Sequence, residues 1–439
     1  MSMLDASIAY PADKGPVAGL RGRPSHIALI GNYLPRLCGL ATYTTHVRQA
    51  LRARFPDTEV DVYAMVDLGH SYAFPEAVVR TIDQDDRASY QAAARAIVAS
   101  GADLIWVQHE FGIFGGPAGA YLLELIDAVT TPVAVTFHTI LETPSTEQQD
   151  VIDRLAARAS LLIVMADRAR AILERAYGVP PGKIAVVPHG VPDRDYIDPP
   201  VARRALGLED RPSIMTFGLL SPGKGIETMI RAMPAILEQC PDALYWIVGA
   251  THPHLVSREG EAYRESLRHL ARSLGVDRWL RWHDGFLEER DLLDRIAAAD
   301  VYVTPYRNPA QITSGTLAYA MGLGKPIVST PYAHASELLA DGYGSLVPFD
   351  DPPAMADALL EILTQDAARR AMAARSYLRG RDMTWRRMVE RSIMRMSAAL
   401  RPPATIPAGA VMPLGCRAAA ERPPNGVLNH AALFFPCPE

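Results

Sequence analysis

A lysine flanked by two glycines, Lys224, lies in the segment Phe217–Gly225, between a predicted strand and a predicted helix. A glycine-lined turn lets backbone N–H groups approach an anion at the positively polarised start of a helix. An ammonium group beside such donors suits a diphosphate, whereas lysines with a purely structural role are normally solvated at the surface. We therefore predict that Lys224 and Gly225 bind a phosphate group.

Two further loops have the composition of an anion site. The segment Gly31–Thr42 follows the first predicted strand, and its Gly39 precedes a predicted helix. This glycine either contacts an anion or simply makes a turn, and both interpretations stay open. The segment Gln311–Leu317 also separates a strand from a helix, and its small residues are predicted to expose N–H and hydroxyl donors to the same ligand. They are Ser314, Gly315 and Thr316.

Histidines follow two of the predicted strands in the first half of the chain. His138 ends the strand Val133–Phe137, and His109 with Glu110 ends a neighbouring one. A single histidine is often a satisfied structural residue, but the end of a strand in an open α/β sheet is where ligands bind. We therefore place His138 in the site. We predict that His109 and Glu110 contact the acceptor, meaning a second substrate that receives a group.

The first half of the chain has the alternation of short apolar runs and helix-period stretches that is typical of a parallel sheet covered by helices. Helices are predicted at Arg87–Ala99 and Glu147–Ala159. The predicted strands are His26–Ile30, Val60–Met65, Val78–Ile82, Asp103–Val107, Val133–Phe137, Leu161–Val164 and Ile184–Val187.

A proline-rich stretch, Pro188–Arg211, interrupts this pattern and is interpreted as the connection to a second sheet. Strands are predicted there at Ser213–Phe217, Leu244–Val248, Val301–Thr304, Ile327–Ser329 and Ser345–Val347. Helices are predicted at Ile226–Gln239, Ala262–Leu274 and Leu287–Ala298. A last helix, Trp385–Leu400, is expected to pack back against the first half.

These elements predict an α/β fold of two Rossmann-like, doubly wound domains that face each other across a cleft. Ligands of such sheets bind beyond the carboxyl ends of the strands, so the loops above are expected to share one crevice. The predicted parts are a flexible tail, an acceptor domain, a donor-binding domain, a helix that crosses back to the first domain, and a second flexible tail. Their ranges are 1–24, 25–198, 199–380, 381–400 and 401–439.

Composition excludes several other classes. The 439 residues are 49% hydrophobic and 21% charged, and 44 basic against 49 acidic residues give a net charge of −5, so nucleic acid is not an expected partner. The cysteines are few and far apart, and no apolar run approaches the length of a membrane span. We expect a cytoplasmic protein, with peripheral membrane contact left open. His252 and His254 flank a proline and have no metal-ligand pattern nearby, so no metal site is predicted.

Over about residues 25–400 the sequence resembles the family 4 retaining glycosyltransferases, which have the two-Rossmann architecture called GT-B. The similarity depends on the order and spacing of six segments. They are Cys38–Tyr43, Thr136–Thr139, Val186–Val191, Gly218–Gly225, Ala299–Pro305 and Gly324–Ser329.

The resemblance implies a nucleotide-sugar donor held mainly by the second domain and acceptor contacts mainly on the first. Lys224 would neutralise the leaving diphosphate, Gly39 would contact the same group through its backbone, and His138 would lie beside the transferred sugar. It also implies that neither a metal ion nor another cofactor is needed, because cationic side chains and helix starts stabilise the anion.

The sequence departs from the family pattern at three positions. Leu219 stands where the family usually has an arginine, and Gln311 and Tyr319 align with two glutamates that contact the sugar and the ribose. Gln311 still offers hydrogen bonds to a sugar, whereas Tyr319 has no bidentate carboxylate for a ribose diol. The leading hypothesis is hexose transfer to a carbohydrate or lipid-linked acceptor. The alternatives are a phosphorylase-like transferase that uses a sugar 1-phosphate and a noncatalytic subunit that binds a sugar or nucleotide.

Overall fold

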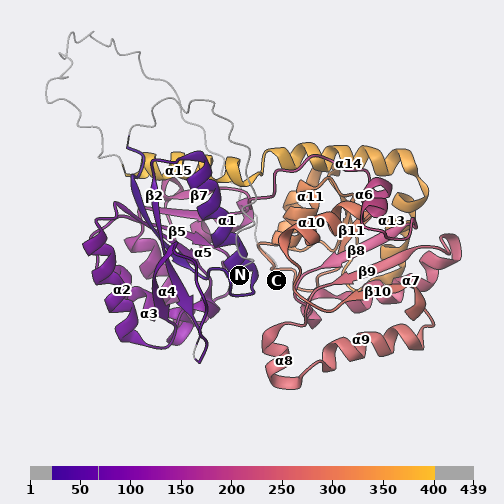
Figure 1. The fold of residues 1–439 in the computed structure, drawn as a ribbon, viewed down its shortest axis with the longest axis horizontal. Coiled ribbons are helices and arrows are strands. Elements are labelled where there is room, and N and C mark those ends of the chain that lie inside the picture. Colours follow the sequence, from indigo (N-terminus) through magenta and orange to yellow (C-terminus); the bar gives the residue numbers. More distant parts are fainter. Residues whose placement is uncertain (1–21, 68, 401–439) are drawn as a thin grey trace, which may run out of the picture. The chain divides into compact units, whose positions relative to one another are not determined.

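The computed structural model describes residues 22–67 and 69–400, and its strands form two parallel sheets (Figure 1). The first sheet has seven strands in the order β3-β2-β1-β4-β5-β6-β7. They are β1 (His26–Gly31), β2 (Glu59–Val66), β3 (Val78–Asp83), β4 (Leu104–His109), β5 (Val133–Phe137), β6 (Leu161–Val164) and β7 (Ile184–Val186).

The second sheet has six strands in the order β10-β9-β8-β11-β12-β13, which repeats the topology of the first. They are β8 (Ser213–Phe217), β9 (Leu244–Val248), β10 (Leu280–His283), β11 (Val301–Thr304), β12 (Ile327–Ser329) and β13 (Ser345–Leu346). Two doubly wound parallel sheets confirm the predicted fold class. The sequence missed the edge strand β10, because its residues Leu-Arg-Trp-His lack the apolar run that marks a buried strand.

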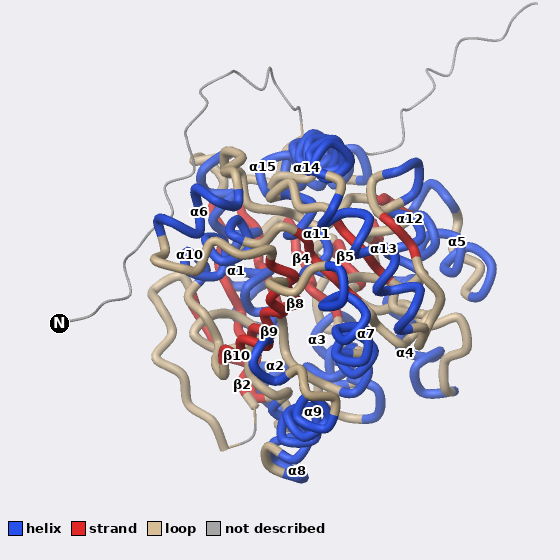
Figure 2. Tube along the Cα trace, turned by 90° about the vertical axis from the view of Figure 1, so that its right-hand side faces the viewer, coloured by secondary structure: helices blue, strands red, loops and turns tan. Residues whose placement is uncertain are grey.

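Helices flank the strands in both views (Figures 1 and 2). Those around the first sheet are α1 (Gly39–Arg54), α2 (Arg87–Ser100), α3 (Tyr121–Asp127), α4 (Thr146–Arg158) and α5 (Asp167–Ala176). A short helix, α6 (Pro199–Ala205), interrupts the predicted connection. The second sheet is accompanied by α7 (Ile226–Gln239), α8 (Pro253–Glu259), α9 (Ala262–Ser273), α10 (Glu289–Ala298), α11 (Gly315–Gly322), α12 (Ala333–Leu338), α13 (Pro352–Thr364) and α14 (Asp366–Arg381).

Burial on both faces explains why the strands are so apolar. Alternate residues of a strand point to opposite faces of its sheet. In β1, Ile27 and Leu29 join one cluster of buried residues, and Ala28 and Ile30 join another. A strand that is covered on both faces reads as a continuous apolar run, which is the pattern that made these strands predictable.

The last described helix, α15 (Trp385–Ala399), contacts α1 and β6 (Figure 1). The chain enters it beside the segment that leaves β7, because Val191 exchanges backbone hydrogen bonds with Met383 and Trp385. Gly190 makes this approach possible, since a Cβ atom there would lie 2.0 Å from the Trp385 ring. The proposed division into domains remains a prediction, and its tail ranges fall mostly outside the described residues.

Candidate functional site

The candidate residues of both sheets follow strands at equivalent places in the topology. In the first sheet the chain order reverses between β1 and β4, and in the second between β8 and β11. The loops after these strands carry Gly39, Glu110, Lys224 and the segment 311–316. Ligands of doubly wound sheets bind at such a switch point, beyond the carboxyl ends of the strands.

Lys224 ends a short 3-10 turn, Pro222–Lys224, and α7 begins two residues later. Gly225 between them has a φ of +63°, and a Cβ atom there would lie 1.9 Å from the Pro305 carbonyl oxygen. Only glycine fits this turn, for two reasons. A left-handed backbone is unfavourable for residues with a side chain, and a Cβ atom here would clash with the loop after β11. The turn therefore fixes the loop of Lys224 against the loop that follows β11.

The half-buried Lys224 ammonium lies over the ring of Tyr306, with Nζ 3.9 Å from the ring centroid. Burial alone would raise the pKa of Tyr306, but Lys224 and the hydroxyls of Thr316 and Ser314 lower it below its usual value. The Tyr306 hydroxyl is 2.8 Å from Thr316 Oγ1, which is 3.2 Å from Ser314 Oγ. A network of polar side chains thus joins the lysine turn to the start of α11.

Ser314 is the N-cap of α11, and its hydroxyl accepts a hydrogen bond from the backbone N–H of Leu317 at 3.3 Å. Its own N–H donates to Nδ1 of His334 at 2.9 Å. Burial, with a smaller effect of His189, lowers the pKa of His334 to about 3, so this acceptor stays unprotonated. The Ser314 N–H is used internally, contrary to the expectation that it is presented to a ligand. The N–H groups of Gly315 and Thr316 occupy the first turn of the helix, where intrahelical acceptors are lacking.

Gln311 and Tyr319 lie at either side of this helix start. The half-buried Gln311 donates from Nε2 to the Thr313 carbonyl at 2.6 Å, which shapes the loop before α11. Tyr319 is buried on α11, and its ring centroid is 6.1 Å from that of His189. Their predicted contacts with a donor remain predictions.

Gly39 is the first residue of α1, a helix of 16 residues. A Cβ atom at this position would have no atom within 4 Å, so no described neighbour requires a glycine here. The preceding Cys38 caps the helix, because its Sγ accepts a hydrogen bond from the Ala41 N–H. The local packing therefore does not explain why this residue is a glycine. The open space at the helix start is consistent with the interpretation that the Gly39 backbone contacts an anion.

His138 follows β5, and its Nε2 is 3.1 Å from Oε1 of Gln108 on β4. Burial, with smaller effects of His189 and His109, lowers the pKa of His138 to about 3, so the imidazole is neutral near pH 7. The Tyr43 ring from α1 contacts it edge-on at a centroid distance of 4.6 Å.

A set of aromatic contacts joins His138 to the second sheet. The Tyr43 ring is also 5.0 Å from the ring of His189, which follows β7. The Nε2 atom of His189 would be 2.9 Å from a Cβ atom on Gly315, so the start of α11 lies against this imidazole. The structure therefore brings His138, Lys224 and Ser314 into one network, through Tyr43, His189 and Tyr306.

His109 is fully buried and packs between the rings of Phe111, Phe114 and Phe137. Neither of its ring nitrogens has a hydrogen-bond partner among the described residues. This position gives no support to the prediction that His109 contacts an acceptor. Although His109 is the last residue of β4, its side chain points into the core.

Glu110 is half-buried and accepts hydrogen bonds from the Thr139 hydroxyl at 2.7 Å and from the Phe111 N–H at 3.0 Å. Burial raises its pKa, although both hydrogen bonds act in the opposite direction. It lies beside His138 through Thr139, so its predicted acceptor contact stays a proposal.

Four residues of this network were missed in the sequence: Tyr43, Gln108, His189 and Tyr306. His189 and Tyr306 follow strands directly, which was an available signal. Gln108 and Tyr43 lie inside a strand and a helix, where sequence alone does not show which way a side chain points.

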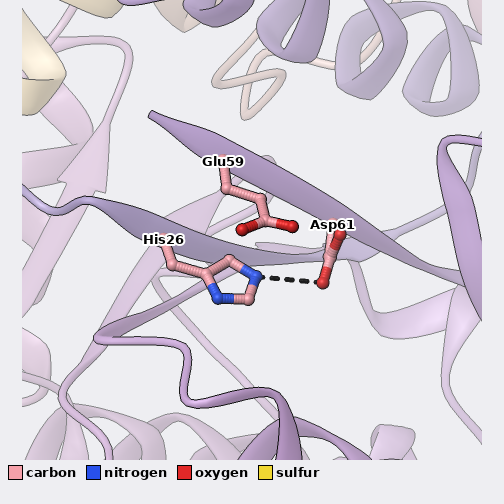
Figure 3. A group of neighbouring side chains, drawn as sticks. All are labelled: His26, Glu59 and Asp61. Atoms are coloured by element: carbon pink, nitrogen blue, oxygen red, sulfur yellow. Dashed lines mark hydrogen bonds and ion pairs between the residues drawn. The ribbon is translucent and has the colours of Figure 1, made fainter. Parts of the chain in front are cut away.

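Figure 3 shows a separate group, His26, Glu59 and Asp61, at the beginnings of β1 and β2. His26 Nε2 is 2.9 Å from Asp61 Oδ2, a hydrogen bond that joins the two strands. These residues lie at the amino ends of the strands, whereas the candidate site follows their carboxyl ends. His252 and His254, for which the sequence predicts no metal site, lie elsewhere in the chain. His252 precedes α8, and the side chain of His254 is outside the described part.

Among residues 22–67 and 69–400, every helix is too short or too polar to cross a lipid bilayer.

Two family models match the chain. Residues 38–195 match the model described as "Glycosyltransferase Family 4", and residues 211–365 match the one described as "Glycosyl transferases group 1". The first match runs from α1 to the end of the first sheet and leaves out β1, and the second contains the whole second sheet. Together they include Gly39, His138, Lys224 and the segment 311–319.

Two of the relatives found carry the same protein name. A D-inositol 3-phosphate glycosyltransferase of Xylanimonas cellulosilytica is 30% identical over 303 residues, which are 64% of this chain and 68% of that protein. A protein of the same name from Corynebacterium urealyticum is 32% identical over 238 residues, which are 52% of this chain. The match spans only 53% of the length of the Corynebacterium urealyticum protein.

Solved structures show the same fold. HepE from Anabaena, in complex with UDP and glucose, superimposes with a TM-score of 0.68 at 16% identity, covering 85% of this chain and 99% of HepE. At this level of identity the likeness concerns the fold alone, and it confirms the predicted two-sheet GT-B architecture.

Proposed function

Because the chain belongs to family 4 of the glycosyltransferases, we propose that it transfers a hexose from a nucleotide-diphosphate sugar to a carbohydrate or lipid-linked acceptor, with retention of the anomeric configuration. The bond between the anomeric carbon and the diphosphate oxygen breaks, and its electron pair leaves with the diphosphate. The acceptor oxygen forms the new bond to that carbon on the same face of the sugar, and its proton is released.

The placement of Lys224 is the observation that carries this proposal. Its ammonium lies in a fixed turn at the end of β8, held over Tyr306 and joined through Thr316 to the start of α11. Charge that develops on a leaving diphosphate is best stabilised by a preorganised cation, because nothing then has to reorganise during the reaction. Lys224 would supply this charge, so a metal ion would not be required for it.

Helix starts would add backbone donors to the same group. We propose that the N–H groups at Gly39 of α1 and at Gly315 and Thr316 of α11 face the diphosphate. The positive end of a helix favours anions, and both helices begin with residues too small to block an approach. Leu219 supplies no second cation, so these donors would take a larger part in holding the anion than in a site with an arginine there.

The neutral imidazole of His138 would hydrogen-bond the transferred hexose, with Gln311 and Tyr319 as further donor contacts. Glu110, next to His138, would face the acceptor. The names of the relatives suggest which acceptor to test first, because both act on D-inositol 3-phosphate. We propose a phosphorylated or lipid-linked polyol as the acceptor class.

The experiment compares Lys224→Ala with Lys183→Ala. Lys183 also ends a Pro-Gly-Lys 3-10 turn, but its ammonium donates to the Ala157 carbonyl at 3.1 Å, outside the network described above. Turnover of UDP-glucose and GDP-mannose is measured with D-inositol 3-phosphate as acceptor. We expect Lys224→Ala to lower turnover on the order of 10²-fold or more, the effect of removing one preorganised anion donor, and Lys183→Ala to retain activity.

Calorimetric titrations of the wild type separate the rival functions. Binding of UDP or GDP followed by turnover of the nucleotide sugar supports the proposal. Binding of sugar 1-phosphates with phosphate-driven turnover would favour the phosphorylase-like transferase, and binding without any turnover would favour a noncatalytic subunit. Unchanged turnover in Lys224→Ala would contradict the role given to the lysine.

A further inference from the structure

Gln108 is a polar residue in a strand that is otherwise apolar up to that point. It is the fifth residue of β4, after Leu-Ile-Trp-Val, and its side chain is fully buried. Gly31 on the neighbouring β1 makes room for it, because a Cβ atom there would lie 3.0 Å from Gln108 Cβ. The sheet thus accommodates an amide where the other central positions hold apolar side chains.

The amide has one hydrogen-bond partner in the part of the chain that the structure describes. Its Oε1 lies 3.1 Å from Nε2 of His138, whereas its Nε2 has no hydrogen-bond partner among the described residues. A buried polar group without a partner destabilises a protein by about 1–3 kcal/mol. An apolar residue would avoid this penalty, so among residues 22–67 and 69–400 the bond to His138 is the contact that accounts for a glutamine.

The direction of this bond fixes the tautomer of His138. An amide oxygen only accepts, so the proton must be on Nε2 of the imidazole. Nδ1 then carries a lone pair, and within residues 22–67 and 69–400 no donor to Nδ1 is found. The ring stays neutral, since burial lowers its pKa to about 3. His138 therefore offers a hydrogen-bond acceptor and not a donor.

We propose that Gln108 is a positioning residue, which holds His138 in the tautomer whose Nδ1 accepts a hydrogen bond from a hydroxyl group of the transferred hexose. The proposal rests on the proposed function for its ligand. A lone acceptor selects a hydroxyl that points its hydrogen toward Nδ1, so Gln108 would act on the sugar and not on the nucleotide.

The first measurement needs no ligand. In protein labelled with ¹⁵N-histidine, the shifts of the two ring nitrogens show which one carries the proton, and His138→Asn identifies the signal. We expect the Nε2–H form in the wild type and a mixture of tautomers in Gln108→Leu. A wild-type signal of the Nδ1–H form would overturn the proposal, whatever the outcome for glycosyl transfer.

The second measurement compares two ligands. Gln108→Leu is expected to weaken UDP-glucose about two- to tenfold, the worth of one hydrogen bond, and to leave UDP binding unchanged. Thr136→Val is the matched control, because Thr136 pairs with Gln108 across β4 and β5 and its buried hydroxyl bonds to Trp106 instead of His138. An equal loss for both ligands in Gln108→Leu would indicate a structural role only.

The third measurement uses the isosteric change Gln108→Glu. The groups that face His138 are His109 from β4, Tyr43 from α1, His189 after β7 and Glu110 near Thr139. A carboxylate in direct contact would raise the pKa of His138 and turn Nδ1 into a donor at low pH. We expect kcat/KM of this variant to fall as pH decreases through the raised pKa. A pH profile identical to that of the wild type would count against the proposal.

Discussion

At the scale of single residues, the imidazole of His109 has a measurable consequence for stability. It is enclosed by phenylalanine rings, and burial lowers its pKa to about 3. An unfolded histidine has a pKa near 6.5, so between these values the unfolded chain binds the proton and the folded chain does not. The contribution of neutral His109 to the unfolding free energy is therefore fully present above about pH 6.5 and is lost as the pH falls toward 3.

His109→Leu should reduce this acid sensitivity. Between pH 7.5 and pH 5 the wild type is expected to lose roughly 2 kcal/mol of unfolding free energy through His109 alone, and the variant should not lose this part. Urea denaturation at the two pH values measures the difference. His269→Leu, at an exposed position on α9, is the control that should behave as the wild type. An equal pH dependence in His109→Leu and the wild type would refute the explanation.

Residue types and the ends of strands were sufficient to select Lys224, Gly225 and His138 as candidates, and their contacts with a ligand remain predictions. They were not sufficient for Gln108, because its role comes from a contact with a residue 30 positions away on another strand. They also gave no sign of the internal contacts of Ser314 and His109. The N–H of the first is taken by His334, and the second points into a cluster of aromatic rings.

At the scale of elements, helix α5 begins without a capping side chain of its own. Its N-cap is Ala166, which has no side-chain acceptor for the first N–H groups. Glu337 of α12 takes this role, because its carboxylate accepts from the N–H groups of Asp167 at 2.7 Å and Arg168 at 3.1 Å. A helix that connects two strands of the first sheet is thus capped by a side chain from a helix that connects two strands of the second.

Glu337→Ala should destabilise the protein by about 1–2 kcal/mol, since it removes both the acceptor and the negative charge from the helix start. The shift of the urea midpoint measures the loss. Glu142→Ala is the control, because Glu142 forms an exposed ion pair with the same Arg168, and such pairs contribute less than about 1 kcal/mol. The same shift of the urea midpoint in both variants would show that the Glu337 cap stabilises the protein no more than an exposed ion pair does.

Most strands were predictable because they are covered on both faces. Four strands of the second sheet have the predicted limits, namely β8, β9, β11 and β12. β10 was missed, since an edge strand needs no apolar run. The capping of α5 by Glu337 was equally invisible, because the sequence separates the two by 170 residues.

At the scale of the whole chain between residues 22 and 400, two sheets of the same topology present their switch-point loops to one network. The contacts of Tyr43, His189 and Gly315 join the two sets of loops, and Val191 and Trp385 run side by side where the chain passes between the sheets. The repeat of the topology follows from the repeated alternation of strands and helices. The aromatic contacts that join the loops depend on side-chain packing, which the alternation does not specify.

The central claim is that Lys224 and the starts of α1 and α11 hold one diphosphate. A crystal structure of the chain with UDP bound tests it most directly. We predict a diphosphate oxygen about 2.7–3.2 Å from Lys224 Nζ, with further oxygens facing the backbone N–H groups at Gly39 and Thr316. A UDP molecule bound with its diphosphate away from Lys224 and from both helix starts would contradict the account.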